Sequence, residues 1–330
     1  MKQLDSGFRR NDAAGLSPSF GRCGTARSVR CRTSFFVIII LALAVFVPLR
    51  SATAEGLPEG GLLHTPFGDA LVARLVADGF DRGRVEALLG DKRVAINGTT
   101  LSYAIVYREF PADYSKFLLE ERLSRARAFI ASNRELLAAA TTRTSVPGEV
   151  IAAILMIESD FGSYRKLHPV LNVFATLLWA AEPANFETVQ AIVQKRLPDV
   201  TAEKVREKTK SKAKWAYEQL TYLLRIAERE KIDLPALEGS WAGAFGMSQF
   251  IPSSYWGYAV DGDGDGRADL YTTADAVFSV GNYLKSFGWR SGLSEEKQRA
   301  VVRRYNNSEL YAATVLGAAA KLGEGAARNP

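Results

Sequence analysis

The chain has 330 residues, 47% of them apolar, and a formal net charge of +6. Residues 1–54 carry eight Lys or Arg side chains against Asp5 and Asp12, which accounts for the whole of that charge and leaves the remainder neutral. The length fits one large domain with lobes or two domains with packed cores, and a neutral body disfavours a nucleic-acid partner.

The first segment has the pattern of an export signal. An apolar run from Phe35 to Val47 follows basic residues, and its length of about 13 residues suits a signal-peptide core and is short for a bilayer span. The triplet from Ala52 to Ala54 has the small residues of a cleavage site. We therefore expect residues 1–54 to be a signal segment, removed after Ala54, that delivers the chain to the periplasm. The alternative is a retained leader that attaches the protein to the membrane.

Cysteine and histidine chemistry is excluded for the exported chain. Cys23 and Cys31 both precede the cleavage site, and the two histidines, His64 and His168, are too few and too far apart for a zinc site or a triad. Carboxylates, hydroxyls and amides must carry the chemistry, and we expect no organic cofactor.

Apolar residues at three- and four-residue spacing predict a mainly α fold, since alternating strand patterns are scarce. The 97–100 stretch is typical of a turn. The acids Asp69 and Asp81 stand where helix caps would lie. The predicted helices are 69–80, 81–90, 114–140, one that Pro147 opens, 170–180, 200–232, 276–289 and 307–322.

The helix predicted at 200–232 carries a dense basic run, Lys204 to Lys214. Such a run could contact an anionic polymer. Because Glu203, Glu207 and Glu218 are interspersed with it, we interpret it as a solvated helix face.

Glu158 follows the apolar stretch Val150–Ile157 directly. A buried helix would desolvate this carboxyl and raise its pKa, and Gly162 predicts a nearby helix end whose dipole acts in the same direction. An acid protonated near neutral pH suits general-acid catalysis. The alternative is that Glu158 is the first solvated residue after a core helix. Asp160, two residues on, would not share its face and is a poor candidate for a paired acid.

Residues 239–260 place small residues between aromatic ones. Gly243 and Gly246 permit close backbone approach, and the Gln249 amide can orient a hydroxyl, an N-acetyl group or a water. This composition suits a sugar-binding groove, although most of the rings are expected to serve the core. The rings are Trp241, Phe245, Phe250, Tyr255 and Trp256.

An acidic loop follows, and its spacing is that of a calcium loop. Asp261, Asp263 and Asp265 occupy positions one, three and five, and Gly266 takes the sharp turn at six. Position twelve is Thr272 where a bidentate Glu is usual, and a loop without metal is the alternative. As a single loop it suits a structural Ca²⁺ better than a sensor. The remaining predicted ligands are Arg267, Asp269 and Asp275.

Five segments in this order resemble the membrane-bound lytic murein transglycosylase B family. They are "VPGEVIAAILMIESDFGSY", "VLNVFATLLW", "GSWAGAFGMSQFIPSSYWGYAVDGDGDG", "DAVFSVGNYLKSFGW" and "RYNNSELYAATV". The resemblance implies a lysozyme-like helical catalytic domain with an added helical lobe and an EF-hand-like loop. The catalytic region would be 55–330, with its core at about 110–320 and an inserted helical segment at about 182–232.

The resemblance also implies roles for individual residues. Glu158 matches the single catalytic acid, and Asp275 matches the acid that closes the calcium loop. The remaining matches line the glycan groove, to which we add the Phe250 ring; they are Ser240, Gln249, Tyr283, Tyr305, Asn306 and Tyr311.

The implied activity is cleavage of the β-1,4 bond between N-acetylmuramic acid and N-acetylglucosamine in peptidoglycan, with formation of 1,6-anhydro ends by one Glu. The partners would be glycan strands and cell-wall synthesis or division proteins, met by a monomer. Two departures, "LLWAAEPANFETVQ" and "RKLHPV", leave the contacts along the groove open. A hydrolytic muramidase and a non-catalytic peptidoglycan-binding protein are the rival functions.

Overall fold

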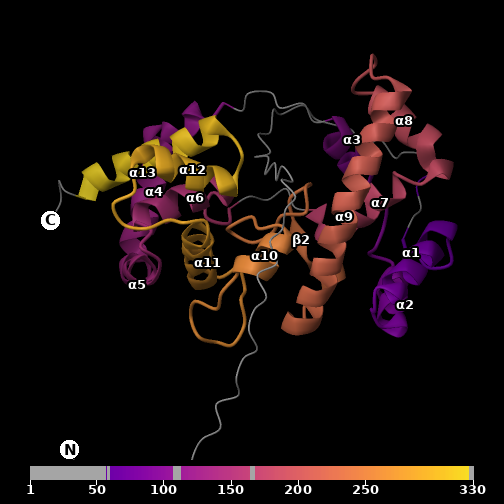
Figure 1. Ribbon diagram of the computed structural model, residues 1–330, viewed down its shortest axis with the longest axis horizontal. Helices are drawn as coiled ribbons and strands as arrows, with labels where there is room; N and C mark the ends of the chain where they lie inside the picture. Colours follow the sequence, from indigo (N-terminus) through magenta and orange to yellow (C-terminus); the bar gives the residue numbers. More distant parts are fainter. Residues whose placement is uncertain (1–56, 58–59, 107–112, 164–167, 327–330) are drawn as a thin grey trace, which may run out of the picture. The chain divides into compact units, whose positions relative to one another are not determined.

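A computed structural model describes residues 57, 60–106, 113–163 and 168–326 (Figure 1). The predicted signal segment lies outside these residues. Within the described part, no helix combines the length and apolar character needed to cross a bilayer.

The described residues are mainly α-helical, as predicted. Short 3₁₀ turns lie at Ser115–Leu118, Pro183–Asn185 and Leu234–Ala236. The first helices are α1 (Pro66–Ala77), α2 (Arg82–Gly90), α3 (Gly98–Val106), α4 (Glu120–Ser132), α5 (Arg134–Thr144), α6 (Gly148–Ser159) and α7 (Val170–Trp179). The later ones are α8 (Phe186–Gln194), α9 (Ala202–Glu230), α10 (Pro252–Tyr258), α11 (Thr273–Ser286), α12 (Glu295–Tyr305) and α13 (Glu309–Ala326).

Helix α6 carries Glu158 and is buried among other helices. Its residues from Val150 to Ser159 are all buried, because apolar side chains surround the helix on every side. It packs against α13, α4, α11 and α5. Pro147 occupies the N-cap position, one residue before the first helical turn, and has no N–H to leave unpaired.

Three predicted elements are wrong in detail. Helix α1 begins at Pro66, with Thr65 rather than Asp69 as its cap. The expected turn at 97–100 is instead the start of α3, because the Asn97 side chain accepts hydrogen bonds from the N–H groups of Thr99 and Thr100.

The helix predicted over 114–140 is broken into a 3₁₀ turn, α4 and α5. The break lies at Asn133, whose backbone leaves the helical region and whose side-chain amide donates to the Phe129 carbonyl. Competition of this kind between an Asn side chain and the helix ladder is a general reason for helix ends. Helix α12 was not predicted, because it has few apolar residues.

Helix α9 matches the predicted charged helix and packs against α7 and α10. Its buried stripe includes Val205, Leu220 and Ile226, while Lys204 is exposed and pairs with Glu207. Lys212 is the exception to the solvated face, since partial burial lowers the pKa of its ammonium group. The basic run is therefore mainly the solvent side of an amphipathic helix.

A two-stranded antiparallel sheet anchors the start of residues 239–260, here called the glycine-rich segment. Strand β1 (His168–Pro169) pairs with β2 (Glu238–Gly239), with His168 opposite Gly239. The chain after β2 then turns at Gly243 and Gly246, which have φ of 78° and 73°. This segment fixes the loop that lies next to the end of α6.

Gly246 provides a test of this packing. A methyl group there would lie 2.3 Å from the Leu270 Cβ, in a backbone conformation that L residues avoid. We expect Gly246→Ala to lower the free energy of unfolding by about 2–5 kcal/mol, from strain and overpacking together. Denaturant unfolding measures the loss.

Gly257→Ala is the matched control. Gly257 lies in α10, and nothing stands within 4 Å of where a methyl would be placed. Ala is a better helix former than Gly, so this variant should unfold at the same denaturant concentration or slightly higher. Equal losses in both variants would contradict the close approach at Gly246.

Candidate active site

Glu158 lies in the last turn of α6 and is 3% exposed. The Tyr311 hydroxyl, from α13, donates a hydrogen bond of 2.6 Å to Glu158 Oε1. Burial raises the pKa of the Glu158 carboxyl to about 8, and the Tyr311 hydrogen bond opposes this rise. The carboxyl therefore holds its proton at neutral pH, as the sequence predicted. The alternative of a solvated Glu158 is wrong.

Helix α6 ends just beyond Glu158, as predicted. Its last residue is Ser159, and the chain then passes through three left-handed residues, Asp160, Phe161 and Gly162. Asp160 is the C-cap of α6, so the helical spacing used to predict its separation from Glu158 does not apply to it. It is buried, and its carboxylate contacts Arg122 and Arg125 of α4.

An aromatic cluster lies beside the acid and brings together three of the predicted groove residues. The rings of Tyr283 and Tyr305 are 4.8 Å apart, and Phe250 lies 5.5 and 5.8 Å from them. The Tyr305 hydroxyl donates to the Ser248 carbonyl and the Tyr283 hydroxyl to the Arg304 carbonyl, each at 2.5 Å. Burial raises the pKa of both hydroxyls, so both remain neutral donors.

The other predicted groove residues are tied to their own loops. The Ser240 hydroxyl oxygen accepts from the N–H groups of Ala242 and Ala244 and so stabilises the turn after β2. Gln249 has a left-handed backbone, and its amide donates to the Gly246 carbonyl at 2.8 Å. Asn306 is buried at the end of α12. These contacts place all three on the segments that border the aromatic cluster.

Most aromatic residues of the 239–260 segment serve the core, as the sequence analysis expected. Trp241, Phe245, Phe250 and Tyr255 are buried, whereas Trp256 is 38% exposed. The composition of this segment therefore reports packing more than ligand contact.

Two contacts around the acid had no predicted counterpart. The Ser159 hydroxyl donates to the Met247 carbonyl at 2.7 Å, which ties the end of α6 to the glycine-rich segment. The Tyr114 ring meets the Tyr311 ring edge-on at 6.1 Å. A hydroxyl residue directly after the acid was a visible signal for the first contact. Nothing in the local sequence points to the second.

The acidic loop folds as a tight turn. The Asp261 carboxylate accepts from the N–H groups of Gly264 and Gly266, at 2.6 and 2.9 Å, and these hydrogen bonds lower its pKa. Gly266 has a φ of 92°, as position six requires. One carboxylate oxygen each from Asp261, Asp263 and Asp265 lies within 4.8 Å of the others. Oxygens bound to one Ca²⁺ at 2.3–2.6 Å span a similar distance, so these three fit a calcium ion.

The two later acids have other contacts in this loop. Asp275 is buried on α11, and its two oxygens accept from the N–H groups of Gly262 and Asp269, at 2.7 and 2.5 Å. It therefore holds both arms of the loop together. Asp269 accepts from the Tyr271 N–H at 2.9 Å. That Arg267, Asp269 and Asp275 complete the ligand set stays a prediction, as does the EF-hand-like character of the loop.

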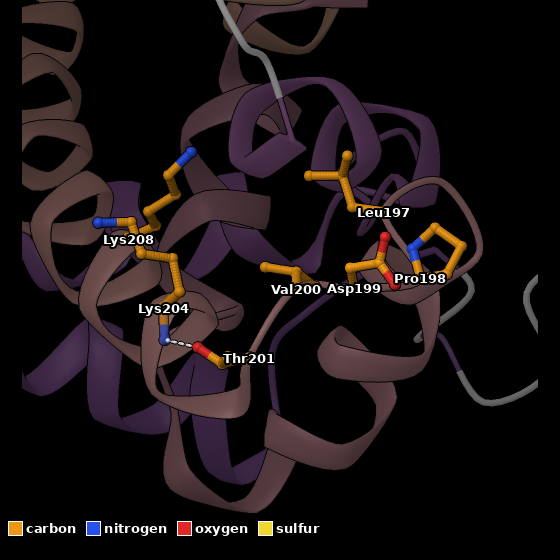
Figure 2. A pocket seen from close by; sticks show the side chains of 7 residues that line it. All are labelled: Leu197, Pro198, Asp199, Val200, Thr201, Lys204 and Lys208. Carbon is orange, nitrogen blue, oxygen red and sulfur yellow. Dashed lines mark hydrogen bonds between the residues drawn. The ribbon is translucent and has the colours of Figure 1, made fainter.

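A hollow of about 430 Å³ lies elsewhere, where α9 begins (Figure 2). None of the predicted site residues lines it. In Figure 2 the Thr201 hydroxyl accepts from the Lys204 N–H and so caps α9. The lining residues are Leu197, Pro198, Asp199, Val200, Thr201, Lys204 and Lys208.

The model of the transglycosylase SLT domain family matches residues 65–298. The chain belongs to this family. It is a peptidoglycan lytic transglycosylase.

Curated and solved relatives agree with this membership. The membrane-bound lytic murein transglycosylase B of Escherichia coli is 26% identical over 294 residues, which are 78% of this chain and 71% of that protein. The Escherichia coli lytic transglycosylase Slt35 in complex with calcium has a TM-score of 0.64 at 22% identity, over 81% of this chain and 96% of that one. SltB3 from Pseudomonas aeruginosa in complex with NAG-anhNAM-pentapeptide has a TM-score of 0.63 at 22% identity, over 80% of each chain. These structural likenesses show the fold of the transglycosylase.

The buried acid should make the stability of the transglycosylase depend on pH. The folded state keeps the Glu158 proton up to about pH 8, whereas an unfolded Glu releases it near 4.5, so stability falls as pH rises between these values. We expect Glu158→Gln, which needs no proton, to be more stable than the parent by on the order of 3 kcal/mol at pH 7. At pH 4 this advantage should vanish. Denaturant unfolding across this range measures both.

Glu149→Gln is the control, because Glu149 lies in the first turn of the same helix. This variant should show no advantage that grows with pH. If Glu158→Gln behaved like it, the buried carboxyl would not be the group that holds the proton.

Proposed function

We propose that this transglycosylase cleaves the β-1,4 bond between N-acetylmuramic acid and N-acetylglucosamine and leaves 1,6-anhydro ends, with Glu158 as the single acid and base. The observation that carries the proposal is the buried, protonated Glu158 carboxyl with Tyr311 on one oxygen. The complex of SltB3 with NAG-anhNAM-pentapeptide supports the substrate class.

The Tyr311 hydrogen bond suggests which oxygen acts. Because Tyr311 donates to Oε1, the proton of the carboxyl is carried by Oε2. Oε2 then protonates the glycosidic oxygen as the bond from that oxygen to C1 of the muramyl residue breaks. The Tyr311 hydroxyl stabilises the carboxylate left behind, since a hydrogen bond to the charged form favours it.

The second half of the reaction uses the same carboxylate as a base. The substrate's own N-acetyl oxygen shares the positive charge that develops at C1. Glu158 then removes the proton of the muramyl C6 hydroxyl, whose oxygen bonds to C1 and closes the anhydro ring. The acid regains its proton, and no water is consumed.

A two-carboxylate mechanism is less well supported. A retaining glycosidase uses a second carboxylate as nucleophile, and an inverting one uses it to activate water. Asp160 is the acid next in sequence, but its carboxylate is bound to Arg122 and Arg125. Because Asp160 is held in these two ion pairs, the substrate's N-acetyl group takes the part of the second carboxylate.

The groove residues have supporting roles in this proposal. Ser240, Gln249 and Asn306 orient the hydroxyl and acetamido groups of the sugars. The neutral hydroxyls and rings of Tyr283, Tyr305 and Tyr311, with Phe250, wall the site and keep water away from Glu158. Exclusion of water protects the C6 attack from competing hydrolysis.

Glu158→Gln tests the assignment, with product masses as the readout. We expect purified peptidoglycan sacculi treated with the parent protein to release products one water lighter than the hydrolytic ones. The variant should release at least about a thousandfold less, because the amide cannot donate the proton. Reducing-end products of full mass would make the enzyme a hydrolytic muramidase. An undiminished rate in the variant would remove Glu158 from the mechanism.

The acidic loop is proposed to hold a structural Ca²⁺. Asp261, Asp263 and Asp265 would ligate it, together with the Arg267 carbonyl, Asp269 and Asp275. The ion would neutralise carboxylates that otherwise repel one another beside the start of α11. Binding to the folded chain alone would stabilise it, by about 2.7 kcal/mol at a hundredfold excess over Kd.

Chelation tests the metal. EDTA should lower the Tm of the parent by a few degrees, and added Ca²⁺ should restore it. The double variant Asp261→Asn with Asp263→Asn should lose this response. Asp199→Asn, an exposed acid outside the loop, should keep it. A parent Tm that ignores both EDTA and Ca²⁺ would rule the site out.

The proposed location of the enzyme is the periplasm, to which the signal segment 1–54 would direct it. Glycan strands would be its substrate, met by a monomer, and cell-wall synthesis or division proteins its recruiting partners. A retained leader would add membrane attachment. The name of the membrane-bound relative in Escherichia coli supports a location at the cell envelope.

A further inference from the structure

The turn that ends α6 is held in an unfavourable conformation. Asp160, Phe161 and Gly162 have φ of 50°, 57° and 82°. Glycine adopts this region freely and Asp tolerates it, but a bulky residue such as Phe is strained there, at a cost of about 1–2 kcal/mol. Two successive non-glycine residues in this region persist only where their surroundings fix them.

Helix α4 supplies the polar half of those surroundings. Arg122 Nη1 lies 2.9 Å from Asp160 Oδ2, and Arg125 contacts the same oxygen. The Asp160 side chain is 8% exposed, while those of Arg122 and Arg125 are 27% and 44% exposed. Two positive groups therefore hold one buried carboxylate from the solvent side.

The ion pairs of Asp160 with Arg122 and Arg125 contribute little to the stability of the fold. Desolvation offsets much of the attraction within a buried ion pair. Asp160 Oδ1 is in addition buried without a hydrogen-bond partner among the described residues, which carries its own cost. What the two arginines supply is a fixed position for Asp160.

Helix α4 supplies an apolar half as well. The Phe161 ring stacks on the Phe129 ring of α4, with centroids 4.3 Å apart and planes 18° from parallel. On the other side, the Ser159 hydroxyl donates to the Met247 carbonyl and accepts from the Gly162 N–H at 2.9 Å. The last turn of α6 is thus held between α4 and the glycine-rich segment.

We propose that Asp160, held by Arg122 and Arg125, is a positioning residue that fixes the last turn of α6 and keeps the Glu158 carboxyl inside its buried site. This inference rests on the proposed role of Glu158 as the acid. Asp160 itself faces the arginines of α4 and touches neither the proton nor the sugar in the reaction.

The groups that face Glu158 from other elements are uncharged, so Asp160 can change the pKa of Glu158 only through its burial. These groups are Tyr311 of α13, Tyr305 of α12 and Tyr283 of α11, and all of them are neutral at the working pH. The buried residues of α5 are Leu137, Ala140 and Thr144, none of which titrates. If the last turn of α6 loosens, water reaches Glu158 and the carboxyl loses its proton at a lower pH.

Asp160→Asn tests the proposal, because Asn keeps the shape and tolerates left-handed φ but loses the charge that the arginines bind. We expect kcat on sacculi to fall about tenfold or more, with KM little changed, since a small misplacement of the acid costs rate rather than binding. The basic limb of the pH–rate profile should also move down by about one pH unit.

Asp233→Asn is the matched control. Asp233 accepts two hydrogen bonds from Arg93, at 2.8 and 3.2 Å, in a pair remote from α6 in the chain. Because both side chains are more than half exposed, loss of this pair should change the Tm little and leave kcat and the pH–rate profile unchanged. A purely structural role for Asp160 would leave kcat and the pH–rate profile unchanged in both variants.

Asp160→Gly is a second variant, for the case in which Asp160→Asn does not fold. Glycine removes the strain at this position as well as the charge, so this variant should fold at least as readily as Asp160→Asn. It should still show the lower kcat and the shifted basic limb. A parent-like kcat and pH profile in both folded variants would overturn the inference. Failure of the parent to release anhydro products would instead overturn the proposed function.

Discussion

The proposed mechanism of this transglycosylase depends on the exclusion of water from one carboxyl, that of Glu158. A free Glu is ionised at neutral pH and has no proton to give to a glycosidic oxygen. Burial at the end of α6 reverses that balance, and the Tyr311 hydroxyl limits the reversal, so that the pKa stops at about 8. At that value the side chain can both release and recover a proton near neutral pH, which is what one residue acting as acid and then base requires.

The elements packed around α6 keep water away from that carboxyl. Helices α13, α4, α11 and α5 cover α6, and the tyrosines at the ends of α12 and α11 fill the space beside Glu158. The glycine-rich segment approaches closely because Gly243 and Gly246 leave room for Phe174 and Leu270. The left-handed turn after Ser159 is the strained part of this arrangement, and α4 restrains it.

The sequence predicted the features that depend on local pattern. The mainly α fold, the burial of α6, the raised pKa of Glu158 and the turn at Gly266 all follow from residue type and spacing. The helix break at Asn133 and the helix cap at Asn97 were not predicted, because each depends on an Asn side chain that hydrogen-bonds to the backbone. The spacing of apolar residues gives no sign of such bonds. The contacts of Tyr114 with Tyr311 and of Asp160 with Arg122 join distant parts of the chain. No local pattern encodes such pairs.

The distance along the chain between Glu158 and Tyr311 has a consequence for how the activity arises. The two residues are 153 positions apart, and the helix that carries the tyrosine is the last of the described part. During synthesis Glu158 is made long before Tyr311, so a chain that lacks α13 lacks the hydrogen bond to Glu158 Oε1. In the proposed mechanism, the catalytic acid is therefore complete only when α13 has packed against α6.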